Sequence, residues 1–191
     1  LMLLLLLMQQ QSKMVVFGLG NPGAKYSGTR HNVGFDTVER IAALKGMKLR
    51  KRCFRLYRRA DLADLSLVEP LTYMNSSGDV VEENLKEGDT MVVIVDQMDL
   101  PPGRMRIRAG GGSAGHNGLK SIIAAHGPDF IRVYIGIGRP EPGATVVDHV
   151  LTRFSPEDRA LVDKSEEKAA EAVLRLYGGE RLESVLHWAN S

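Results

Sequence analysis

The sequence predicts an α/β protein, a single-domain three-layer sandwich with a mixed, mostly parallel sheet between helices. Short runs of β-branched and aromatic residues, typical of buried strands, alternate along the chain with amphipathic segments of helical periodicity. The 191 residues, of which 43% are hydrophobic, suit one domain with a sizeable core. No internal repeat or low-complexity linker divides the sequence.

The chain starts with a leucine-rich run over residues 1–8. This run is far shorter than the ~20 residues that a membrane-spanning helix needs, and it lacks the basic start and the small-residue cleavage site of a signal peptide. We therefore expect residues 1–13 to be an N-terminal extension outside the fold, and residues 14–191 to be the domain. We expect no contact with a membrane.

A strand is expected over residues 14–17, followed by a glycine-rich loop over residues 18–31. Glycines and a proline let this loop adopt backbone conformations that a Cβ would hinder, while polar side chains crowd into it. Loops held in this way on a rigid scaffold often carry function, so we interpret this one as the active-site loop. Asn32 has the position of a helix cap, and apolar residues at helical spacing predict a helix over residues 33–44.

The motif Gly18-x-Gly20-x-x-Gly23 also matches the dinucleotide-binding fingerprint. That fingerprint requires its last glycine to open a helix whose amides meet a pyrophosphate, whereas here residues 24–31 separate Gly23 from the helix cap. A cofactor-dependent oxidoreductase is therefore a disfavoured alternative, and we expect no cofactor.

The middle of the chain predicts strands of different kinds. Residues 54–60 and 65–68 indicate a short antiparallel pair, which Pro70 ends. After a segment of helical rhythm at residues 80–85, the apolar run over residues 91–95 is typical of a central strand buried on both faces. Alternating polar and apolar residues predict a further strand over residues 104–108. The guanidinium groups of Arg104, Arg106 and Arg108 should then lie on one side of it.

The C-terminal part begins with a second glycine-rich loop, over residues 110–118. Its amides can point at an anion or a carbonyl before a helix that starts with Leu119. The elements expected after it are a strand over residues 130–137, a short apolar element over 145–151, a surface helix over 156–177 and a last short helix before Trp188.

The formal net charge of +2 is too small to indicate a nucleic-acid partner by itself, but the basic residues are unevenly placed. Cys53 is the only cysteine, which excludes an intrachain disulfide, argues against a cysteine-based metal site and fits a reducing cytoplasm. It is a poor catalytic thiol because no nearby motif supplies a base. The densest basic cluster has two possible explanations, a solvated face of the protein and an anion-binding surface. It comprises Lys45, Lys48, Arg50, Lys51, Arg52, Arg55, Arg58 and Arg59.

His31 is the candidate general base, because histidine titrates near neutrality and this one lies in the glycine-rich loop. A histidine base works best when a carboxylate fixes its tautomer and stabilises the imidazolium. We assign this role to Asp96, at the end of the apolar strand, where strand ends converge on a ligand site. The competitor is Asp99, which is also explained as a turn residue before Pro101.

Several blocks of the sequence, taken together and in this order, resemble the bacterial peptidyl-tRNA hydrolases. The blocks are Gly-Leu-Gly-Asn-Pro-Gly at residues 18–23 with Tyr26 and Thr-Arg-His-Asn-x-Gly-Phe at 29–35, and residues 69–78, 96–103, 110–120 and 135–138. The resemblance extends from about residue 14 to the C-terminus. It implies hydrolysis of the ester between a peptide and the 3′-terminal ribose of tRNA, with peptidyl-tRNA as the partner. It also implies a cytoplasmic monomer that needs no metal.

The resemblance also implies roles for individual residues. His31, oriented by Asp96, would activate water, and Asn21 would hold the water or the scissile region as the third catalytic residue. Asn32 stays open between a helix cap and a site residue. The implied substrate-binding residues are Tyr26, Tyr73, Met74, Asn75, His116 and Asn117. The implied contacts to tRNA phosphates are Arg106, Arg108 and Lys120.

One position departs from the family pattern, and two alternative functions remain. Where some members carry a second arginine before the Ile-Gly-Ile-Gly block, this chain has Tyr134, so Arg132 stands alone and part of the phosphate clamp is unaccounted for.

Gly-x-Ser113-x-Gly fits the spacing of a serine nucleophile but lacks the sharp strand-to-helix context. A non-enzymatic RNA-binding adaptor of the same fold is the other alternative; the intact residues that oppose it are Asn21, His31, Asp96 and Asn117.

Overall fold

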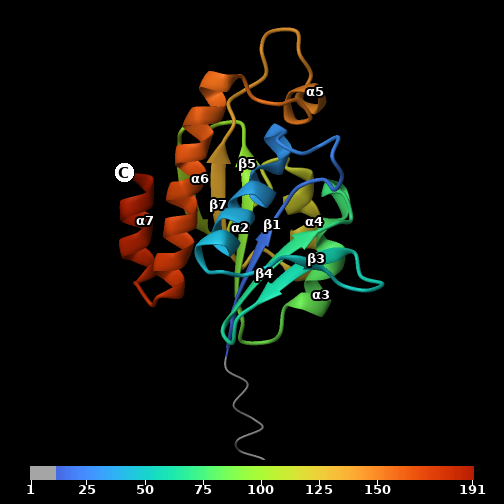
Figure 1. The fold of residues 1–191 in the computed structure, drawn as a ribbon. Coiled ribbons are helices and arrows are strands. Elements are labelled where there is room, and N and C mark those ends of the chain that lie inside the picture. The colour runs from blue at the N-terminus through green and yellow to red at the C-terminus, as the bar shows by residue number, and fades with distance from the viewer. Residues whose placement is uncertain (1–11) are drawn as a thin grey trace, which may run out of the picture.

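The computed structural model describes residues 12–191, which form one seven-stranded sheet with helices on both faces (Figure 1). The strand order is β2-β3-β4-β1-β5-β7-β6. This arrangement confirms the predicted α/β class and the predicted three layers.

The sheet is mixed, as predicted, and its parallel part lies at its centre. The parallel strands are, in spatial order, β4 (Leu65–Pro70), β1 (Met14–Gly18), β5 (Thr90–Gln97) and β7 (Ile131–Gly136). The strands added antiparallel at the two edges are β2 (Arg50–Lys51), β3 (Tyr57–Asp61) and β6 (Met105–Ala109). The carboxyl ends of the parallel strands therefore meet at one edge of the sheet.

Helices cover both faces of the sheet. The face on the left of Figure 1 packs against α2 (Val33–Leu44), α6 (Pro156–Tyr177) and α7 (Leu182–Asn190). The opposite face is covered by η2 (Met74–Val80), α3 (Val81–Asn84) and α4 (Asn117–His126). Two short helices, η1 (Arg30–Asn32) and α5 (Val146–Val150), lie beyond the carboxyl ends of the strands. Within residues 12–191, none of the helices has the length and the apolar composition that crossing a bilayer requires.

Side chains of the central strands alternate between the two cores. In β1, Phe17 belongs to the core under α4, whereas Val16 belongs to the core under α2. In β5, Val93 and Ile94 divide in the same way. Because successive strand residues point to opposite faces and both faces are covered, these strands have continuous apolar sequences.

Several element boundaries differ from the sequence prediction. β3 begins at Tyr57 rather than at residue 54, because Phe54 has a φ of 55° and leaves the extended conformation. The helix after the second glycine-rich loop begins at Asn117 rather than at Leu119, and His116 caps it. The last helix does not stop before Trp188 but contains it. β6 begins at Met105, so Arg104 lies just before the strand, although its carbonyl still accepts from the Gly136 N–H at 2.8 Å.

The amino end of the described chain is tied to the sheet. Of the predicted extension, only Ser12 and Lys13 belong to the described residues, and the leucine-rich run lies outside them. The Lys13 N–H donates to Asp89 Oδ1 at 2.9 Å, and the Lys13 carbonyl accepts from the Thr90 N–H at 2.8 Å. The main chain is thus held in place from the residue before β1.

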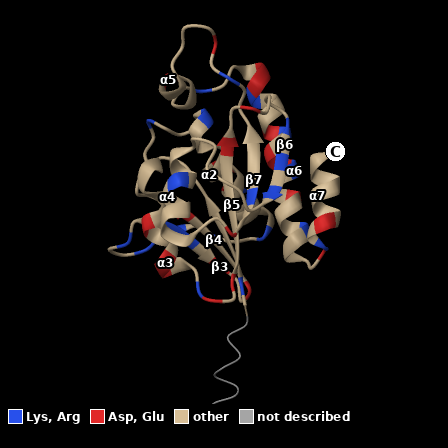
Figure 2. Cartoon of the chain, turned by 180° about the vertical axis from the view of Figure 1, so that it is seen from behind, with Lys and Arg blue, Asp and Glu red and all other residues tan. Residues whose placement is uncertain are grey.

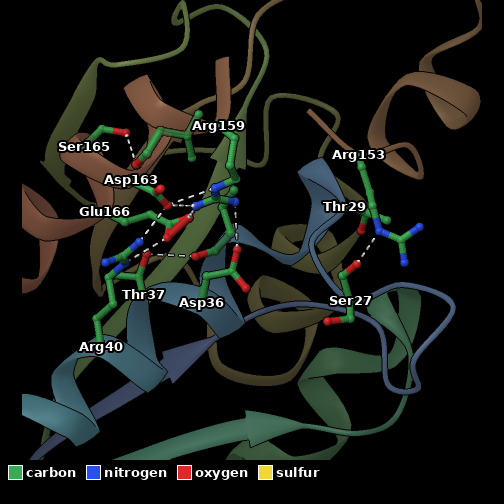
Figure 3. Close-up of polar contacts among 12 residues, drawn as sticks. Ser27, Thr29, Asp36, Thr37, Arg40, Arg153, Arg159, Asp163, Ser165 and Glu166 are labelled. Atoms are coloured by element: carbon green, nitrogen blue, oxygen red, sulfur yellow. Dashed lines mark hydrogen bonds and ion pairs between the residues drawn. The ribbon is translucent and has the colours of Figure 1, made fainter. Parts of the chain in front are cut away.

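An ionic cluster around the buried Glu166 fixes α2 to α6 (Figure 3). Arg40 donates to Asp163 at 2.7 Å and to Glu166 at 3.1 Å. Arg159 donates to Asp163 at 2.9 Å, to Asp36 at 3.2 Å and also to Glu166. Because α2 begins directly after η1, the cluster anchors the helix that follows the active-site loop.

A second buried carboxyl group, Glu69 on β4, makes folding sensitive to pH. Its side chain is fully buried, and Arg58 Nε lies 3.0 Å from its Oε2. Burial raises the pKa of Glu69 to about 8; Arg58 opposes the rise and Glu39 adds to it. The folded state therefore keeps a proton that the unfolded state releases near the ordinary glutamate pKa of 4.5. The stability that this proton contributes is present at acidic pH and is lost as the pH rises through 8.

Replacing Glu69 with glutamine should remove this pH dependence. Between pH 5 and pH 9, the free energy of unfolding of the variant should fall by about 4 kcal/mol less than that of the parent protein. Urea unfolding at a series of pH values measures the difference. The matched control is Glu83→Gln, because Glu83 is in an ion pair with the exposed Arg55 at 3.0 Å. Parallel pH curves for Glu69→Gln and the parent protein would contradict the assignment.

Candidate active site

A cavity of about 560 Å³ lies beyond the carboxyl ends of β1 and β5. Ligands bind at this edge in open parallel sheets. The active-site loop and η1 contribute Asn21 and His31, and β5 contributes Asp96. The start of α4 contributes His116 and Asn117. Residues predicted to act together from distant parts of the sequence therefore share one cavity.

Two imidazole rings share one carboxylate oxygen at the base of this cavity. His31 Nδ1 lies 2.9 Å from Asp96 Oδ1, and His116 Nε2 lies 2.8 Å from the same oxygen. The ring centroids are 5.2 Å apart. Asp96 is only 4% exposed, so its charge is stabilised mainly by these neighbours.

The protonation states follow from these contacts. Burial opposes the charge of Asp96, but the two histidines outweigh it and hold the pKa of the carboxyl well below its usual range. Burial lowers the pKa of His31, and the charge and hydrogen bond of Asp96 more than offset this, so the pKa of His31 is raised. An ionised Asp96 accepts hydrogen bonds, so the neutral His31 ring carries its proton on Nδ1 and leaves Nε2 as a base.

His116 is held in one tautomer from its other side. Its Nδ1 accepts a hydrogen bond from the Leu119 N–H at 3.3 Å, at the start of α4. Nε2 is therefore the nitrogen that carries the proton toward Asp96. The resemblance implied a substrate-binding role for His116, and no sequence motif predicted its bond to Asp96.

Asp99, the competitor for the carboxylate role, lies away from the histidines. Its side chain is exposed and forms an ion pair with Arg139. Ser113 lines the cavity, but its hydroxyl accepts from the Gly115 N–H at 3.4 Å, and within residues 12–191 no histidine bonds to it. The geometry therefore favours a histidine-activated water over a serine nucleophile.

Asn21 and Asn32 brace the active-site loop. Asn32 Oδ1 accepts from the Asn21 N–H at 2.9 Å, and Asn32 Nδ2 donates to the Asn21 carbonyl at 2.9 Å. Asn32 is the N-cap residue of α2, as predicted, but its side chain makes no capping bond to the helix. Asn21 Oδ1 accepts from the Met74 N–H at 2.8 Å, and within residues 12–191 Asn21 Nδ2 has no hydrogen-bond partner. This amide group is left for a ligand in the cavity.

The glycines of this loop serve close packing. A Cβ on Gly18 would lie 2.3 Å from the Gly34 carbonyl oxygen, and a Cβ on Gly34 would lie 2.4 Å from the Leu19 carbonyl oxygen. Both positions therefore need glycine to bring the loop against the start of α2. The glycine at position 18, which also matches the dinucleotide-binding fingerprint, is therefore explained by close packing between the end of β1 and the start of α2.

The second glycine-rich loop is held from below by Arg132. This side chain is fully buried and donates to the carbonyls of Gly111 and Gly112, and to that of Pro128 at 3.1 Å. Its guanidinium also lies 4.4 Å from the Phe130 ring centroid. Arg132 is therefore a structural residue and not the remaining half of a phosphate clamp.

The other predicted substrate-binding residues divide into two groups. Tyr73, Met74, Asn75 and Asn117 line the cavity. Tyr26 does not; its ring packs edge-on against Tyr73, with the centroids 6.3 Å apart. Tyr26 therefore supports the mouth of the cavity from behind Tyr73.

The predicted phosphate-binding residues lie next to the main cavity. Arg106 and Arg108 line a second cavity of about 370 Å³. Tyr134 lines both cavities and thus forms part of the wall between them. Lys120 is exposed on α4 and lines neither.

The apolar wall formed by α5 was missed in the sequence. Val146, Val147, Val150 and Leu151 line the cavity, and Val147 is 63% exposed. The only sequence signal was the short apolar element at residues 145–151.

Arg30, the residue before the candidate base, holds this wall in place. Its guanidinium donates to Thr152 Oγ1 at 2.6 Å, to the His149 carbonyl at 3.2 Å and to the Arg153 carbonyl at 3.2 Å. These groups lie at and just beyond the end of α5, where unpaired carbonyls favour a cation. The apolar wall and the His31 turn are thus joined.

The histidine and carboxylate cluster is also the place where a metal ion could bind. Among the described residues, His31, Asp96 and His116 are the group of potential ligands whose donor atoms all lie within 4.8 Å of one another. In the structure these atoms are used for the two hydrogen bonds to Asp96 Oδ1.

Comparisons with known proteins show which family the chain resembles. A family model described as peptidyl-tRNA hydrolase matches residues 15–190. The peptidyl-tRNA hydrolase of Halalkalibacterium halodurans is 44% identical over 167 residues, which cover 83% of this chain and 90% of the relative. That of Geobacillus kaustophilus is 45% identical over 163 residues, covering 81% and 88%. The crystal structure of the Acinetobacter baumannii peptidyl-tRNA hydrolase has a TM-score of 0.85 and 32% identity, covering 94% of this chain and 95% of that one.

Proposed function

The chain belongs to the peptidyl-tRNA hydrolase family, and on this premise we propose how its residues hydrolyse the ester that joins a peptide to the 3′-terminal ribose of tRNA. The observation that carries the proposal is the pair of hydrogen bonds from His31 and His116 to Asp96 in a cavity at the carboxyl edge of the sheet. The alternative, a non-enzymatic RNA-binding adaptor, is not favoured by the family match.

His31 acts as the general base. Its Nε2 takes a proton from water while the water oxygen attacks the ester carbonyl carbon, and the negative charge of Asp96 stabilises the imidazolium that forms. The imidazolium then returns the proton to the ribose oxygen as the carbon–oxygen bond breaks. The products are the peptide carboxylic acid and the free tRNA. This route uses no metal and no cofactor.

Amide groups stabilise the reaction centre. Asn21 Nδ2 faces the cavity without a partner within residues 12–191, which suits it to donate to the developing oxyanion or to hold the water. Asn75 and Asn117 line the same cavity and can hold peptide carbonyls, because an asparagine side chain offers both donors and an acceptor. Tyr73 and Met74 form the adjoining wall.

We propose that the acceptor end of tRNA lies over the second cavity, with phosphates near Arg106, Arg108 and Lys120. Basic side chains on one exposed strand face give affinity for phosphate without reading sequence. Tyr134 stands beside them and can donate one hydrogen bond. We further propose that residues 14–191 act as a monomer, since one chain supplies the whole cavity, and that they act in the cytoplasm, where peptidyl-tRNA is made.

Release of peptide from an N-blocked aminoacyl-tRNA tests the proposed function. We expect the purified protein to release N-acetylphenylalanine from N-acetylphenylalanyl-tRNA in the presence of a metal chelator. Absence of release, with the protein folded and the tRNA bound, would contradict hydrolysis as the function.

Replacing Arg106 or Arg108 with alanine should weaken tRNA binding and reduce its dependence on salt. Each lost phosphate contact should lower the slope of log affinity against log salt by about 1. Titration of labelled tRNA at several salt concentrations measures both quantities. Arg139→Ala is the control, because Arg139 is engaged with Asp99. Unchanged affinity and slope in the first two variants would place the phosphate path elsewhere.

A further inference from the structure

The loop between β2 and β3 carries an aromatic side chain that nothing covers. Phe54 is 98% exposed, and its φ of 55° lies in the left-handed region that a bulky residue rarely adopts. Leu56, two residues later, is 59% exposed. The loop projects from the body on the side of α3 and α4, and Figure 2 shows Lys and Arg along it. Strained backbone held at a surface position is more common at functional sites than elsewhere.

The charges around this loop are all of one sign along the chain. The sequence contains no Asp or Glu between Lys45 and Ala60. Arg52 pairs with Asp61 at 2.8 Å and Arg55 with Glu83 at 3.0 Å, so these two are partly neutralised. Within residues 45–60, the basic residues that pair with no carboxylate of the described chain are Lys45, Lys48, Arg50 and Lys51. An anionic partner would complement this surface.

A purely structural explanation accounts for only part of this surface. β2 is an edge strand, and charged side chains on an edge strand prevent pairing with other chains. This explains Arg50 and Lys51. It does not explain Phe54, because an uncovered phenyl ring beside an edge strand promotes association. The ring therefore needs a partner of its own.

We propose that the β2–β3 loop binds unpaired RNA, with a base stacked on the Phe54 ring and phosphates held by Arg50 and Lys51. Sites for single-stranded nucleic acid combine aromatic rings, on which bases of any identity stack, with cations that follow the backbone. In the strand order, β2 lies at the opposite edge of the sheet from β6, which carries Arg106 and Arg108. At ~4.8 Å per strand the two edges are about 30 Å apart, so this site is separate from the proposed phosphate contacts. The inference goes beyond ester hydrolysis and does not depend on it.

Fluorescence anisotropy with a short, labelled, unstructured RNA tests the site in the full chain. We expect Phe54→Ala to weaken binding about tenfold and Phe54→Trp to preserve or strengthen it. Phe54→Leu should bind as weakly as Phe54→Ala, because leucine is apolar but offers no flat ring. Replacing Arg50 and Lys51 together with alanine should lower the salt slope by about 1.4. Repeating the series in an Arg106→Ala, Arg108→Ala background isolates the loop.

Two controls keep the result interpretable. Leu44→Ala changes another exposed apolar side chain, 66% exposed at the end of α2, and should leave RNA affinity unchanged. Turnover of N-acetylphenylalanyl-tRNA at saturating concentration should be the same in every loop variant, so failure of the RNA site is distinguishable from failure of the hydrolase. Unchanged RNA affinity in Phe54→Ala would overturn the proposal. Full affinity in Phe54→Leu would also overturn it, because leucine has no ring on which a base can stack.

Discussion

Replacing His31 with alanine is expected to lower kcat for peptide release by about 10²–10⁴-fold while leaving the affinity for tRNA unchanged. The variant removes the ring whose Nε2 takes the proton from water, but it leaves Asn21, Asp96 and the surface arginines in place. Single-turnover hydrolysis of N-acetylphenylalanyl-tRNA measures the loss, and tRNA titration measures the affinity.

Two further measurements guard the interpretation of this variant. Thermal unfolding should show that the His31 variant is folded, since the ring is held mainly by Asp96 and lies at a cavity. His149→Ala serves as a histidine control outside the cluster, because the His149 ring bonds to the Gly138 carbonyl at 2.8 Å. A His31 variant with parental turnover would remove the general base from the mechanism.

Replacing Asp96 with asparagine is expected to lower kcat by about 10³-fold or more and to move the pH profile. The amide has the same shape, but it neither fixes the Nδ1 proton of His31 nor stabilises the imidazolium. His31 must be neutral to act, and Asp96 raises the pKa of His31, so activity in the parent protein is lost as the pH falls through that raised pKa. Without the carboxylate, burial alone lowers the pKa of His31. The acid limb of the residual activity should therefore move to lower pH.

Asp99→Asn is the matched control for this experiment, because Asp99 lies three positions along the chain and is exposed. It should change neither kcat nor the pH profile. An acid limb that stays in place in Asp96→Asn, or that moves equally in Asp99→Asn, would show that Asp96 does not set the pKa of the base.

The parts of the fold that local sequence determines were predicted well. The apolar run of β5 and the periodicity of α6 specify their elements without help from the rest of the chain. The pairing of His31 with Asp96 could also be predicted, because both follow parallel strands and such strand ends meet at one edge. Where the prediction failed, the decisive contact joins residues far apart in sequence.

Arg132 and His116 make contacts that the sequence did not predict. In the sequence Arg132 is one more cation beside a basic strand, and only the folded loop reveals that its guanidinium is used by the carbonyls of residues 111, 112 and 128. His116 has the sequence position of a substrate contact, but its distance from Asp96 depends on how α4 docks onto the sheet. Asn32 likewise occupies a capping position, yet its amide has a stronger competing partner in Asn21.

The bonds from Arg30 to the end of α5 bear on how a bulky substrate enters. If the cleft widens by outward movement of α5, either the Thr152 and His149 bonds break or the turn that carries His31 is pulled along. The width of the cleft and the position of His31, which activates the water, therefore depend on each other. A peptide wide enough to push α5 outward would therefore also move the His31 imidazole away from the ester.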